Sequence, residues 1–407
     1  MVPNGWTQKF LEDIAEFSQG IQVNPDKQFT EYSEGMVRFL RITDFVDQDE
    51  TPRFIQNPSN RFIVNNTDLS MVRYGSAGAG DLVRGLSGAI ANNLFRVIPN
   101  ELEVTKDYLW VYLSQSKIKH FLFGNSTSST MPAVSFKLVG KVLVDLPPLP
   151  EQQKIAKILS TWDKAIGTTE RLIENSTQQK KALMQQLLTG KKRLLDDEGE
   201  RFEGEWDWVD LEDVCDVKGG KRLPKGNALS EAKTSNPYIR VADMYMGGVD
   251  LSDIKYVPES IAPLIKNYTI SKDDLFITVA GTLGIVGKIP NELDGANLTE
   301  NADKLTNIKC DKTFLLYVMM SSIIQRYIEA ESTQNAQPKL ALARIRGFKV
   351  PLPNLEEQQK IATVLTNADK EIELLEQQLA DLQQEKKALM QVLLTGKVRV
   401  LVNGEVA

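Results

Sequence analysis

The chain has 407 residues, of which 42% are hydrophobic and 25% charged, and this composition and length are typical of a soluble protein with two domains. No apolar run approaches the ~18 residues that cross a bilayer, the first residues lack the pattern of a secretion signal, and two cysteines are too few for a disulfide framework or a thiolate metal cluster. We therefore expect a cytoplasmic protein without a metal site. The net charge of −6 does not exclude nucleic-acid binding, because a local basic surface is what binds phosphate groups.

Residues 1–147 are predicted to form a first module of mixed α and β structure, dominated by a curved sheet. A β-type run covers 37–42, an amphipathic helix is expected over 108–122, and a polar loop follows at 125–132. Basic residues are scattered through the module, and such charges often belong to a merely solvated surface. Arg41 could equally be paired with Asp44. The candidates for contact with phosphate groups are Lys27, Arg41, Arg61, Arg73, Arg84, Lys137 and Lys141.

Residues 148–195 are predicted to form a long helix. Apolar residues recur at steps of three and four from Ile155 to Leu187, which is the pattern of a coiled-coil seam. Pro150 stands near the expected start of the helix and Thr189-Gly190 at its expected end. A helix of roughly 39 residues would be ~58 Å long. Its apolar stripe cannot be buried inside one module of this size, so we expect it to pair with a second helix.

Residues 196–353 are predicted to form a second module of the same class. Strands are expected at 238–241 and 274–279, a helix at 314–328 and a polar loop at 331–338. The segment 218–226 combines glycines, which permit a close backbone approach, with four basic charges, as contact with phosphate requires. Arg240, like Arg41, could instead be held by an aspartate three residues on, here Asp243. The candidates in this module are Lys218, Lys221, Arg222, Lys225, Arg240, Lys339, Arg344 and Arg346.

Residues 354–407 repeat the first long helix. Glu-Gln-Gln-Lys-Ile-Ala occurs at 151–156 and 357–362, Lys-Lys-Ala-Leu-Met-Gln at 180–185 and 386–391, and Leu-Leu-Thr-Gly-Lys at 187–191 and 393–397. Between Glu151 and Lys191, 23 of 41 positions match the residues 206 positions later without a gap. The first helix segment has nine basic and four acidic residues and the second six and nine, so opposite charges favour their antiparallel pairing. Pairing with a helix of another subunit is the alternative.

The two modules are far less alike than the two helices. Leu-Glu-Asp recurs at 11–13 and 211–213, and Arg41 and Asp44 match Arg240 and Asp243, but most other positions differ. Drift after a duplication would erode modules and helices alike. The contrast indicates that the helices perform one task twice, whereas the modules share a framework and recognise different things. The predicted fold class is α+β, with two globular modules separated by two long antiparallel coiled-coil helices in an internal pseudo-two-fold repeat.

No complete active site is predicted. His120 is the only histidine and has no partner for metal binding or proton transfer. The glycine-rich segment 281–288 lacks the spacing of a phosphate-binding loop, and Ile289 stands where Ser or Thr would bind Mg²⁺. Asn236-Pro237-Tyr238 lacks the second proline of the amino-methyltransferase motif, and no glycine-rich cofactor loop precedes it. We therefore expect a chain without catalytic or metal-binding residues.

The repeated segments at 148–156, 180–191 and their second copies resemble those of the specificity subunit of type I restriction-modification systems, and the resemblance covers essentially the whole length. It implies that residues 1–147 and 196–353 are target-recognition domains, each reading half of a bipartite, asymmetric site in double-stranded DNA. The helices at 148–195 and 354–407 would set the gap between the half-sites and dock two methyltransferase subunits, to which restriction subunits add. The implied docking residues are Glu151, Gln152, Gln153, Ile155, Glu357, Gln358, Gln359 and Ile361.

The resemblance also implies that this chain holds no cofactor, because S-adenosylmethionine, ATP and Mg²⁺ would be bound by the partner subunits. The main alternative is a two-module coiled-coil adaptor that binds protein partners and has no role on DNA. A self-sufficient methyltransferase is a second alternative, which would require this chain alone to bind S-adenosylmethionine.

Overall fold

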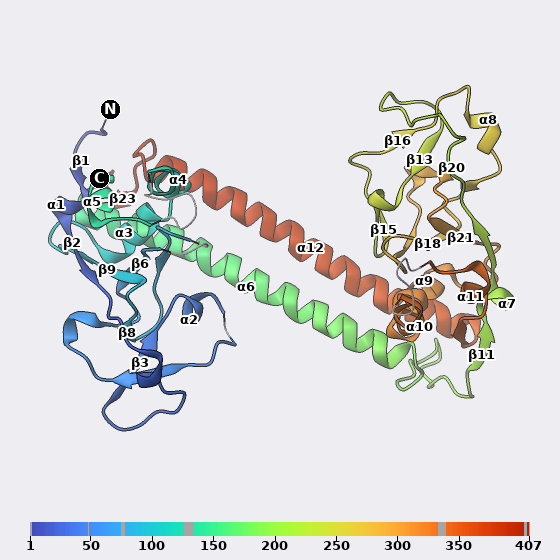
Figure 1. Cartoon of the computed structure of the whole chain (residues 1–407), viewed down its shortest axis with the longest axis horizontal. Helices are drawn as coiled ribbons and strands as arrows, with labels where there is room; N and C mark the ends of the chain where they lie inside the picture. The colour runs from blue at the N-terminus through green and yellow to red at the C-terminus, as the bar shows by residue number, and fades with distance from the viewer. Residues whose placement is uncertain are drawn as a thin grey trace. The chain divides into compact units, whose positions relative to one another are not determined.

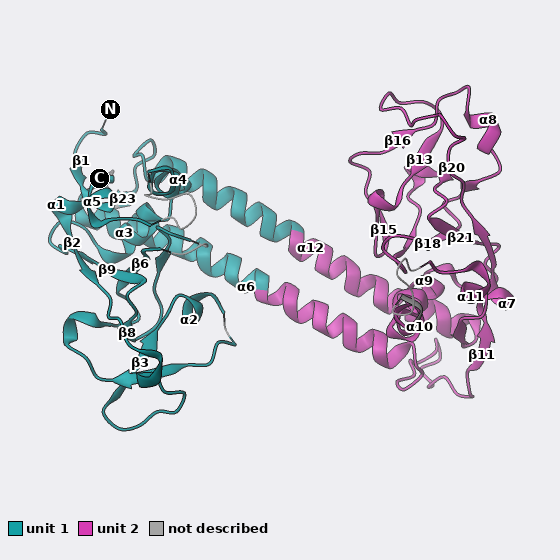
Figure 2. Cartoon of the chain, viewed as in Figure 1, with its two compact units in different colours: residues 1–170, 377–407 teal, residues 171–376 magenta. Residues whose placement is uncertain are grey.

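Two long helices and two similar sets of small sheets make up the chain in a computed structural model that describes residues 2–47, 49–74, 78–125, 133–332, 339–402 and 405–406 (Figure 1). The chain divides into two units (Figure 2). Unit 1 contains Met1–Glu170 and Gln377–Ala407, and unit 2 contains Arg171–Glu376. Each long helix therefore contributes one part to each unit.

Unit 1 contains a two-stranded sheet of β1 and β10 and two four-stranded sheets, in the orders β2-β9-β6-β7 and β4-β3-β8-β5. The pair β3–β8 is parallel, whereas the other pairs of the two larger sheets are antiparallel. The strands are β1 Thr7–Phe10, β2 Ala15–Gln19, β3 Met36–Leu40, β4 Arg53–Gln56, β5 Ile63–Val64, β6 Leu69–Val72, β7 Leu82–Val83, β8 Gly88–Ile90, β9 Leu94–Pro99, β10 Leu143–Leu146, β23 Leu401–Val402 and β24 Glu405–Val406. The short helices are α1 Leu11–Ile14, η1 Pro25–Lys27, α2 Thr43–Val46, η2 Asn60–Phe62, α3 Lys106–Leu113, α4 Ser116–Gly124 and α5 Phe136–Gly140.

Unit 2 repeats these sheets strand for strand, as β11-β22, β12-β21-β18-β19 and β16-β13-β20-β17, and it again has one parallel pair, β13–β20. A hairpin of β14 and β15 is added. The strands are β11 Asp207–Asp210, β12 Asp216–Gly219, β13 Pro237–Ile239, β14 Met244–Tyr245, β15 Gly248–Val249, β16 Lys255–Tyr256, β17 Thr269–Ile270, β18 Leu275–Thr278, β19 Val286–Lys288, β20 Ala296–Leu298, β21 Ala302–Thr306 and β22 Lys349–Leu352. The short helices are α7 Leu211–Val214, η3 Val241–Asp243, α8 Ala262–Ile265, η4 Asn291–Leu293, α9 Lys312–Met320, α10 Ser322–Ser332 and α11 Leu342–Arg346.

The two modules share the framework that the sequence predicts, with two differences. Three small sheets take the place of the single curved sheet expected in each module. The helices expected over 108–122 and 314–328 are each two helices, α3–α4 and α9–α10. The backbone becomes extended between the two helices of each pair, at Gln115 with ψ of 137° and at Ser321 with ψ of 162°. The polar loops fall largely outside the described residues.

The long helices are α6 Leu149–Leu187 and α12 Leu355–Leu393, both of 39 residues, as their periodicity predicts. Gly190 and Gly396 follow them with φ of +69° and +65°, a conformation in which glycine is strongly favoured. The residues expected on both seams, from Ile155 to Leu187 and from Ile361 to Leu393, are buried or half-buried. Among the described residues, no helix is both long and apolar enough to cross a membrane.

Within each unit, segments of α6 and α12 run antiparallel. Asp163 and Lys386 form an ion pair in unit 1, and Lys180 and Asp369 form the matching ion pair in unit 2. The two pairs are related by the repeat, because each lysine and each aspartate has its copy 206 positions away. The charge complementarity predicted from sequence is thus realised within the chain.

The core of each module includes one end of both long helices. In unit 1, Ile155 and Leu159 of α6 share a core with Leu393 of α12. In unit 2, Leu187 of α6 shares a core with Ile361 and Leu365 of α12. The start of one long helix and the end of the other therefore close the core of each module.

Candidate functional site

Glu151, the first residue of the repeated motif, lies at the centre of a buried joint in unit 1. Its carboxylate accepts hydrogen bonds from the indole nitrogen of Trp6 at 3.0 Å and from two guanidinium nitrogens of Arg399 at 2.7 Å each. Arg399 also donates to the carbonyl of Asn4 at 2.8 Å. The glutamate is 0% exposed, and its hydrogen bond raises the pKa of Arg399 further. The start of α6, the segment before β1 and the segment after α12 meet at this carboxylate.

Unit 2 contains the same joint around Glu357. Trp206 donates to its carboxylate at 3.1 Å, and Arg193 donates two bonds at 2.6 and 2.7 Å. Arg193 also donates to the carbonyl of Gly204, as Arg399 does to that of Asn4. We call these two arrangements the Trp-Glu-Arg joints. Their Trp and Arg members were not predicted, although extending the repeat comparison to 193 and 399 and to 6 and 206 would have revealed both pairs.

The glutamines that follow connect each module to its long helix. The side chain of Gln152 accepts from the amide of Thr105 at 2.9 Å and donates to the carbonyl of Pro147 at 2.9 Å. Gln358 accepts from the amide of Asp311 at 2.8 Å and donates to the carbonyl of Pro353 at 2.7 Å. Both glutamines are buried.

The structure therefore places most of the implied docking residues in the interior. Ile155 and Ile361 lie in the module cores, and the glutamates and first glutamines are used within the chain. Only Gln153 and Gln359 of the eight are exposed. Packing within the chain therefore accounts for the recurrence of six of them, namely Glu151, Gln152, Ile155, Glu357, Gln358 and Ile361. Their role in docking a partner subunit stays a prediction.

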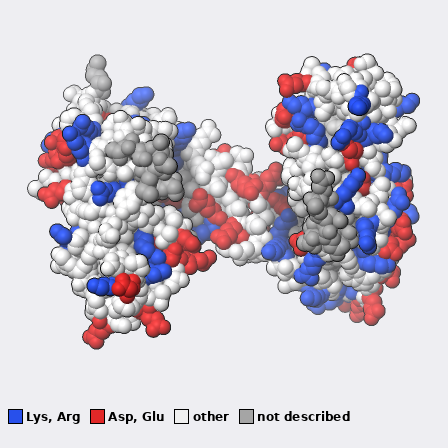
Figure 3. All heavy atoms as spheres, in the orientation of Figure 1, with Lys and Arg blue, Asp and Glu red and all other residues white. Residues whose placement is uncertain are grey.

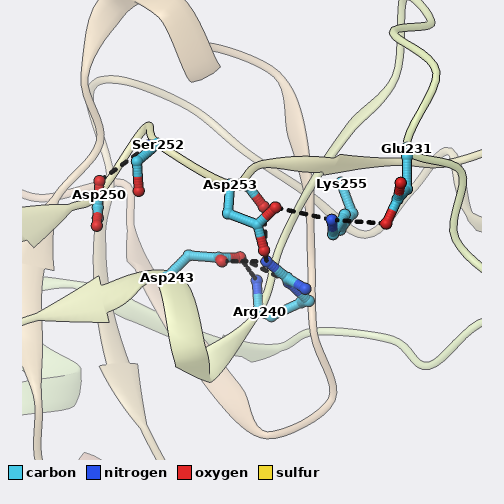
Figure 4. A network of polar contacts seen from close by, with 7 residues as sticks. All are labelled: Glu231, Arg240, Asp243, Asp250, Ser252, Asp253 and Lys255. Carbon is cyan, nitrogen blue, oxygen red and sulfur yellow. Dashed lines mark hydrogen bonds and ion pairs between the residues drawn. The ribbon is translucent and has the colours of Figure 1, made fainter.

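Arg41 and Arg240 are paired with aspartates, which confirms the alternative to phosphate contact that the sequence offered for both residues. In unit 2, the backbone amide and Nε of Arg240 donate to one carboxylate oxygen of Asp243 at 2.7 and 3.1 Å, and Nη2 donates to the other at 2.6 Å. Nη2 also reaches Asp253 at 3.2 Å, and Lys255 extends the network to Glu231 (Figure 4). Hydrogen bonds from Lys255 and Arg240 lower the pKa of Asp253.

Unit 1 repeats this arrangement, which we call the arginine clasp. The backbone amide and Nε of Arg41 donate to Asp44 at 2.9 and 3.0 Å, and Nη2 donates to Glu50 at 3.0 Å and to the carbonyl of Thr51 at 3.1 Å. The carboxylate of Asp44 is buried, and Arg38 supplies a further bond at 3.1 Å. The charge of Arg41 is thus neutralised within the chain.

The remaining basic candidates fall into two groups. Several have partners: Arg73 donates to Gln19, Arg84 pairs with Asp107 and stacks on Trp110, Arg61 lies over Phe62, Lys218 pairs with Asp216, Lys221 lies over Tyr268, Arg222 pairs with Glu300, and Arg346 donates to the carbonyl of Val217. Arg344 is exposed. The side chains of Lys27, Lys137, Lys141, Lys225 and Lys339 are exposed and form no hydrogen bond or ion pair with the described residues. On the face shown, basic and acidic side chains are interspersed over both units (Figure 3).

Gly220 of segment 218–226 serves the fold. A Cβ on Gly220 would lie 2.0 Å from the carbonyl oxygen of Thr299, and one on Gly20 in unit 1 would lie 2.1 Å from that of Ala91. Both positions thus need glycine because two backbone segments of the chain approach closely. The expected close approach exists, but it is to the chain's own backbone.

Asp303 of β21 is a buried acid beside two of the basic candidates. Its Oδ2 has no hydrogen-bond partner, and burial raises its pKa to about 6 against the opposing charges of Lys339 and Arg346. The described residues contain no group of three or more His, Cys, Asp or Glu side chains that could hold a metal ion. His120 is exposed on α4, and its Nδ1 lies 2.6 Å from the carbonyl oxygen of Ser116.

A family model described as "Type I restriction modification DNA specificity domain" matches residues 3–176 and 203–384. The chain belongs to this family. It is 25% identical over 409 residues to the type I restriction enzyme MjaVIII specificity subunit of Methanocaldococcus jannaschii, covering 98% of this chain and 94% of that one. It is 24% identical over 378 residues to the EcoBI specificity subunit of Escherichia coli, covering 88% and 78%. The type I S subunit structure from M. genitalium has the same fold, with a TM-score of 0.60, 17% identity and 97% coverage of both chains.

The two copies of the specificity domain close each other's joints. The first matched range contains Trp6 and Glu151, and the second contains Trp206 and Glu357. Arg193 follows the first copy in sequence but completes the joint of the second, and Arg399 follows the second copy but completes the joint of the first. Each specificity domain therefore depends on the segment that follows the other copy.

Removal of the Glu357 carboxylate should destabilise unit 2. Glu357→Ala leaves the charge of Arg193 and the indole of Trp206 without their acceptor in a buried setting, so we expect a loss of about 3 kcal/mol. Urea denaturation followed by tryptophan fluorescence would measure it. Lys218→Ala, which removes an exposed ion pair, is the matched control and should cost at most about 1 kcal/mol. Equal effects of the two substitutions would contradict the importance of the joint.

Asp303 should make the stability of unit 2 depend on pH. The pKa of Asp303 is about 6 in the folded state and 3.8 ordinarily. Its protonated form therefore contributes fully to the free energy of unfolding below pH 3.8, and this contribution is lost as the pH rises through about 6. Asp303→Asn should therefore raise the urea midpoint at pH 7.5 and change it little at pH 3.5. Asp216→Asn should act in the opposite direction, because hydrogen bonds from Asn307 and Lys218 lower the pKa of Asp216. A gain for Asp303→Asn that is the same at every pH would refute this cause.

Proposed function

We propose that the two specificity domains of this chain read the two halves of a bipartite, asymmetric site in double-stranded DNA. The observation that carries the proposal is that one framework, repeated strand for strand, bears different side chains at matching positions. Counted from the matching aspartates Asp44 and Asp243, unit 1 exposes Val46 where unit 2 exposes Tyr245. The family description names DNA specificity as the role of both copies. Two different surfaces on one framework suit two different sequences of the same polymer.

Contacts with phosphate groups are assigned to the exposed, unpaired lysines. Phosphate contacts position a protein on DNA and are made chiefly by lysine and arginine, whereas base contacts give specificity. The chain itself would carry out no catalysis. Adenine methylation with S-adenosylmethionine and ATP- and Mg²⁺-dependent cleavage would belong to methyltransferase and restriction subunits, as the relatives' description as subunits of restriction enzymes suggests. The lysines proposed to bind phosphate are Lys27, Lys137, Lys141, Lys225 and Lys339.

The methylated sequence should be split in two. Single-molecule sequencing of DNA from a host that carries this chain with its partner subunits should show modified adenines in a motif of two unlike halves with a fixed gap. A strain without the gene for this chain is the control. A continuous motif, or modification that does not depend on the chain, would exclude the proposal, and the second result would favour a role as a protein adaptor.

We assign the docking of two methyltransferase subunits to an exposed stripe of each long helix and not to the buried motif at its start. Gln178, Lys181, Ala182 and Gln185 of α6 are exposed and identical to Gln384, Lys387, Ala388 and Gln391 of α12. Their spacing places them on one face of a helix. Packing explains identity at buried positions but not at exposed ones, so we assign these stripes to two copies of one partner.

Each stripe should bind one partner subunit. Ala182→Arg places a bulky charge in the centre of the first stripe and should reduce the number of methyltransferase subunits per chain from two to one, as read by native mass spectrometry. Ala388→Arg should do the same, and the double variant should bind none. Gln179→Arg is the control, because that position is exposed, lies more than a quarter turn of the helix from the centre of the stripe, and differs from Glu385 in the other copy. Two bound subunits in the double variant would rule out the stripes.

A further inference from the structure

Each arginine clasp holds both ends of a loop. Arg41 binds Asp44 near the start of its loop and Glu50, nine residues on, at the end. Arg240 binds Asp243 at the start and Asp253, 13 residues on, at the end (Figure 4). We call residues 42–47 and 49, the described residues between the ends of the first clasp, and residues 241–252 the clasped loops. One guanidinium that joins both ends fixes how a loop projects from its module.

The clasped loops differ although their clasps are the same. The first contains the helical turn α2, and the second contains η3 and the β14–β15 hairpin. In the hairpin, a Cβ on Gly248 would lie 2.8 Å from the hydroxyl oxygen of Tyr245, so the tyrosine ring lies across this glycine. The backbone amide of Gly247 donates to the carbonyl of Val286 at 2.7 Å, which fixes the hairpin against β19. The described residues of both loops are thus held by contacts within the chain, but each loop has its own shape.

Both loops expose an apolar side chain two residues after the clasp aspartate. Val46 is 73% exposed and Tyr245 is 56% exposed, and Met246 beside it is 42% exposed. An apolar side chain that is held in water on an ordered loop gives up burial that would stabilise it, at roughly 25 cal/mol per Å². A binding partner that covers these side chains would recover that free energy.

The charges of the loops distinguish between the phosphates and the bases of DNA. Neither loop contains lysine or arginine, and Asp47, Asp49 and Asp250 are exposed carboxylates. Such a loop repels phosphate but can accept hydrogen bonds from the amino groups of cytosine and adenine, while apolar side chains contact the methyl group of thymine. A cation flanks the second loop, because the exposed Lys288 ends β19, where its amide donates to the carbonyl of Gly247.

We propose that the clasped loops are the base-reading elements of the two domains, with Val46 and Tyr245 as specificity-determining residues in the major groove. A helical turn and a two-stranded ribbon are the two shapes that this groove admits. The arginine clasp acts as a positioning device, since it fixes each loop without itself reading bases. This inference rests on the proposed function, because it specifies which residues of the two domains read the sequence.

The test is methylome sequencing of hosts that carry the full system with Tyr245→Ala or Val46→Ala. Tyr245→Ala should relax base preference in one half-site, Val46→Ala in the other, and each should weaken binding of the assembled complex to the wild-type site by roughly 5- to 150-fold. The half-site that stays intact shows that the complex has folded and assembled. Leu264→Ala and Leu102→Ala are matched controls, since these leucines are 65% and 86% exposed in units 2 and 1. Both should leave the motif unchanged.

Two results would overturn the inference and separate it from the proposed function. If the wild type shows a split motif and both loop variants retain both half-sites, the loops do not read bases. Altered subunit content with unchanged half-sites would assign the loops to a protein partner instead. If the wild type shows no split motif, the proposed function fails, and this inference fails with it.

Discussion

A buried glutamate that binds one tryptophan and one arginine is the interaction on which each specificity domain depends. A carboxylate moved out of water costs several kcal/mol unless its oxygens are fully used. Glu151 and Glu357 meet this condition with two bonds from a guanidinium and one from an indole. Because removing the glutamate takes the shared acceptor from both donors, the joint constrains three separate segments at once. The repeated sequence motif is therefore maintained by packing as well as by any partner.

This constraint changes how identity between the two copies is interpreted. Glu151, Gln152 and Ile155 are buried, so packing within the domain is enough to explain why they are identical in both copies. Their identity is therefore no evidence for a partner. Identity at exposed positions such as Lys181 and Ala182 has no such explanation within the chain. Separating the two kinds of identity moves the proposed docking surface away from the start of each long helix and toward its second half.

The sequence predicts the long helices well because their seams are periodic over many turns, and a periodic pattern leaves little choice of structure. It predicts the pairing of α6 with α12 because their charges are complementary. It fails at the break between α3 and α4, because the apolar periodicity continues across Gln115, where the backbone becomes extended. It does not reveal that the glutamates of the repeated motif are buried, because a charged motif does not show whether its carboxylate faces water or an arginine more than 150 positions away in sequence, as in the joint of Glu357 with Arg193. For Arg41, the local spacing to Asp44 already offered the correct alternative.

The joints also bear on the order in which the units can be completed. The second joint needs only residues between Arg193 and Glu357, which lie within the continuous range of unit 2. The first joins Trp6 to Arg399, and Leu393, Leu394 and Val400 belong to its core, so unit 1 lacks part of its interior until the second long helix is present. Contacts between residues so far apart in sequence close large loops and form slowly. Domain 1 is therefore complete only when domain 2 and both long helices have been made, which ties the presence of one reading surface to that of the other.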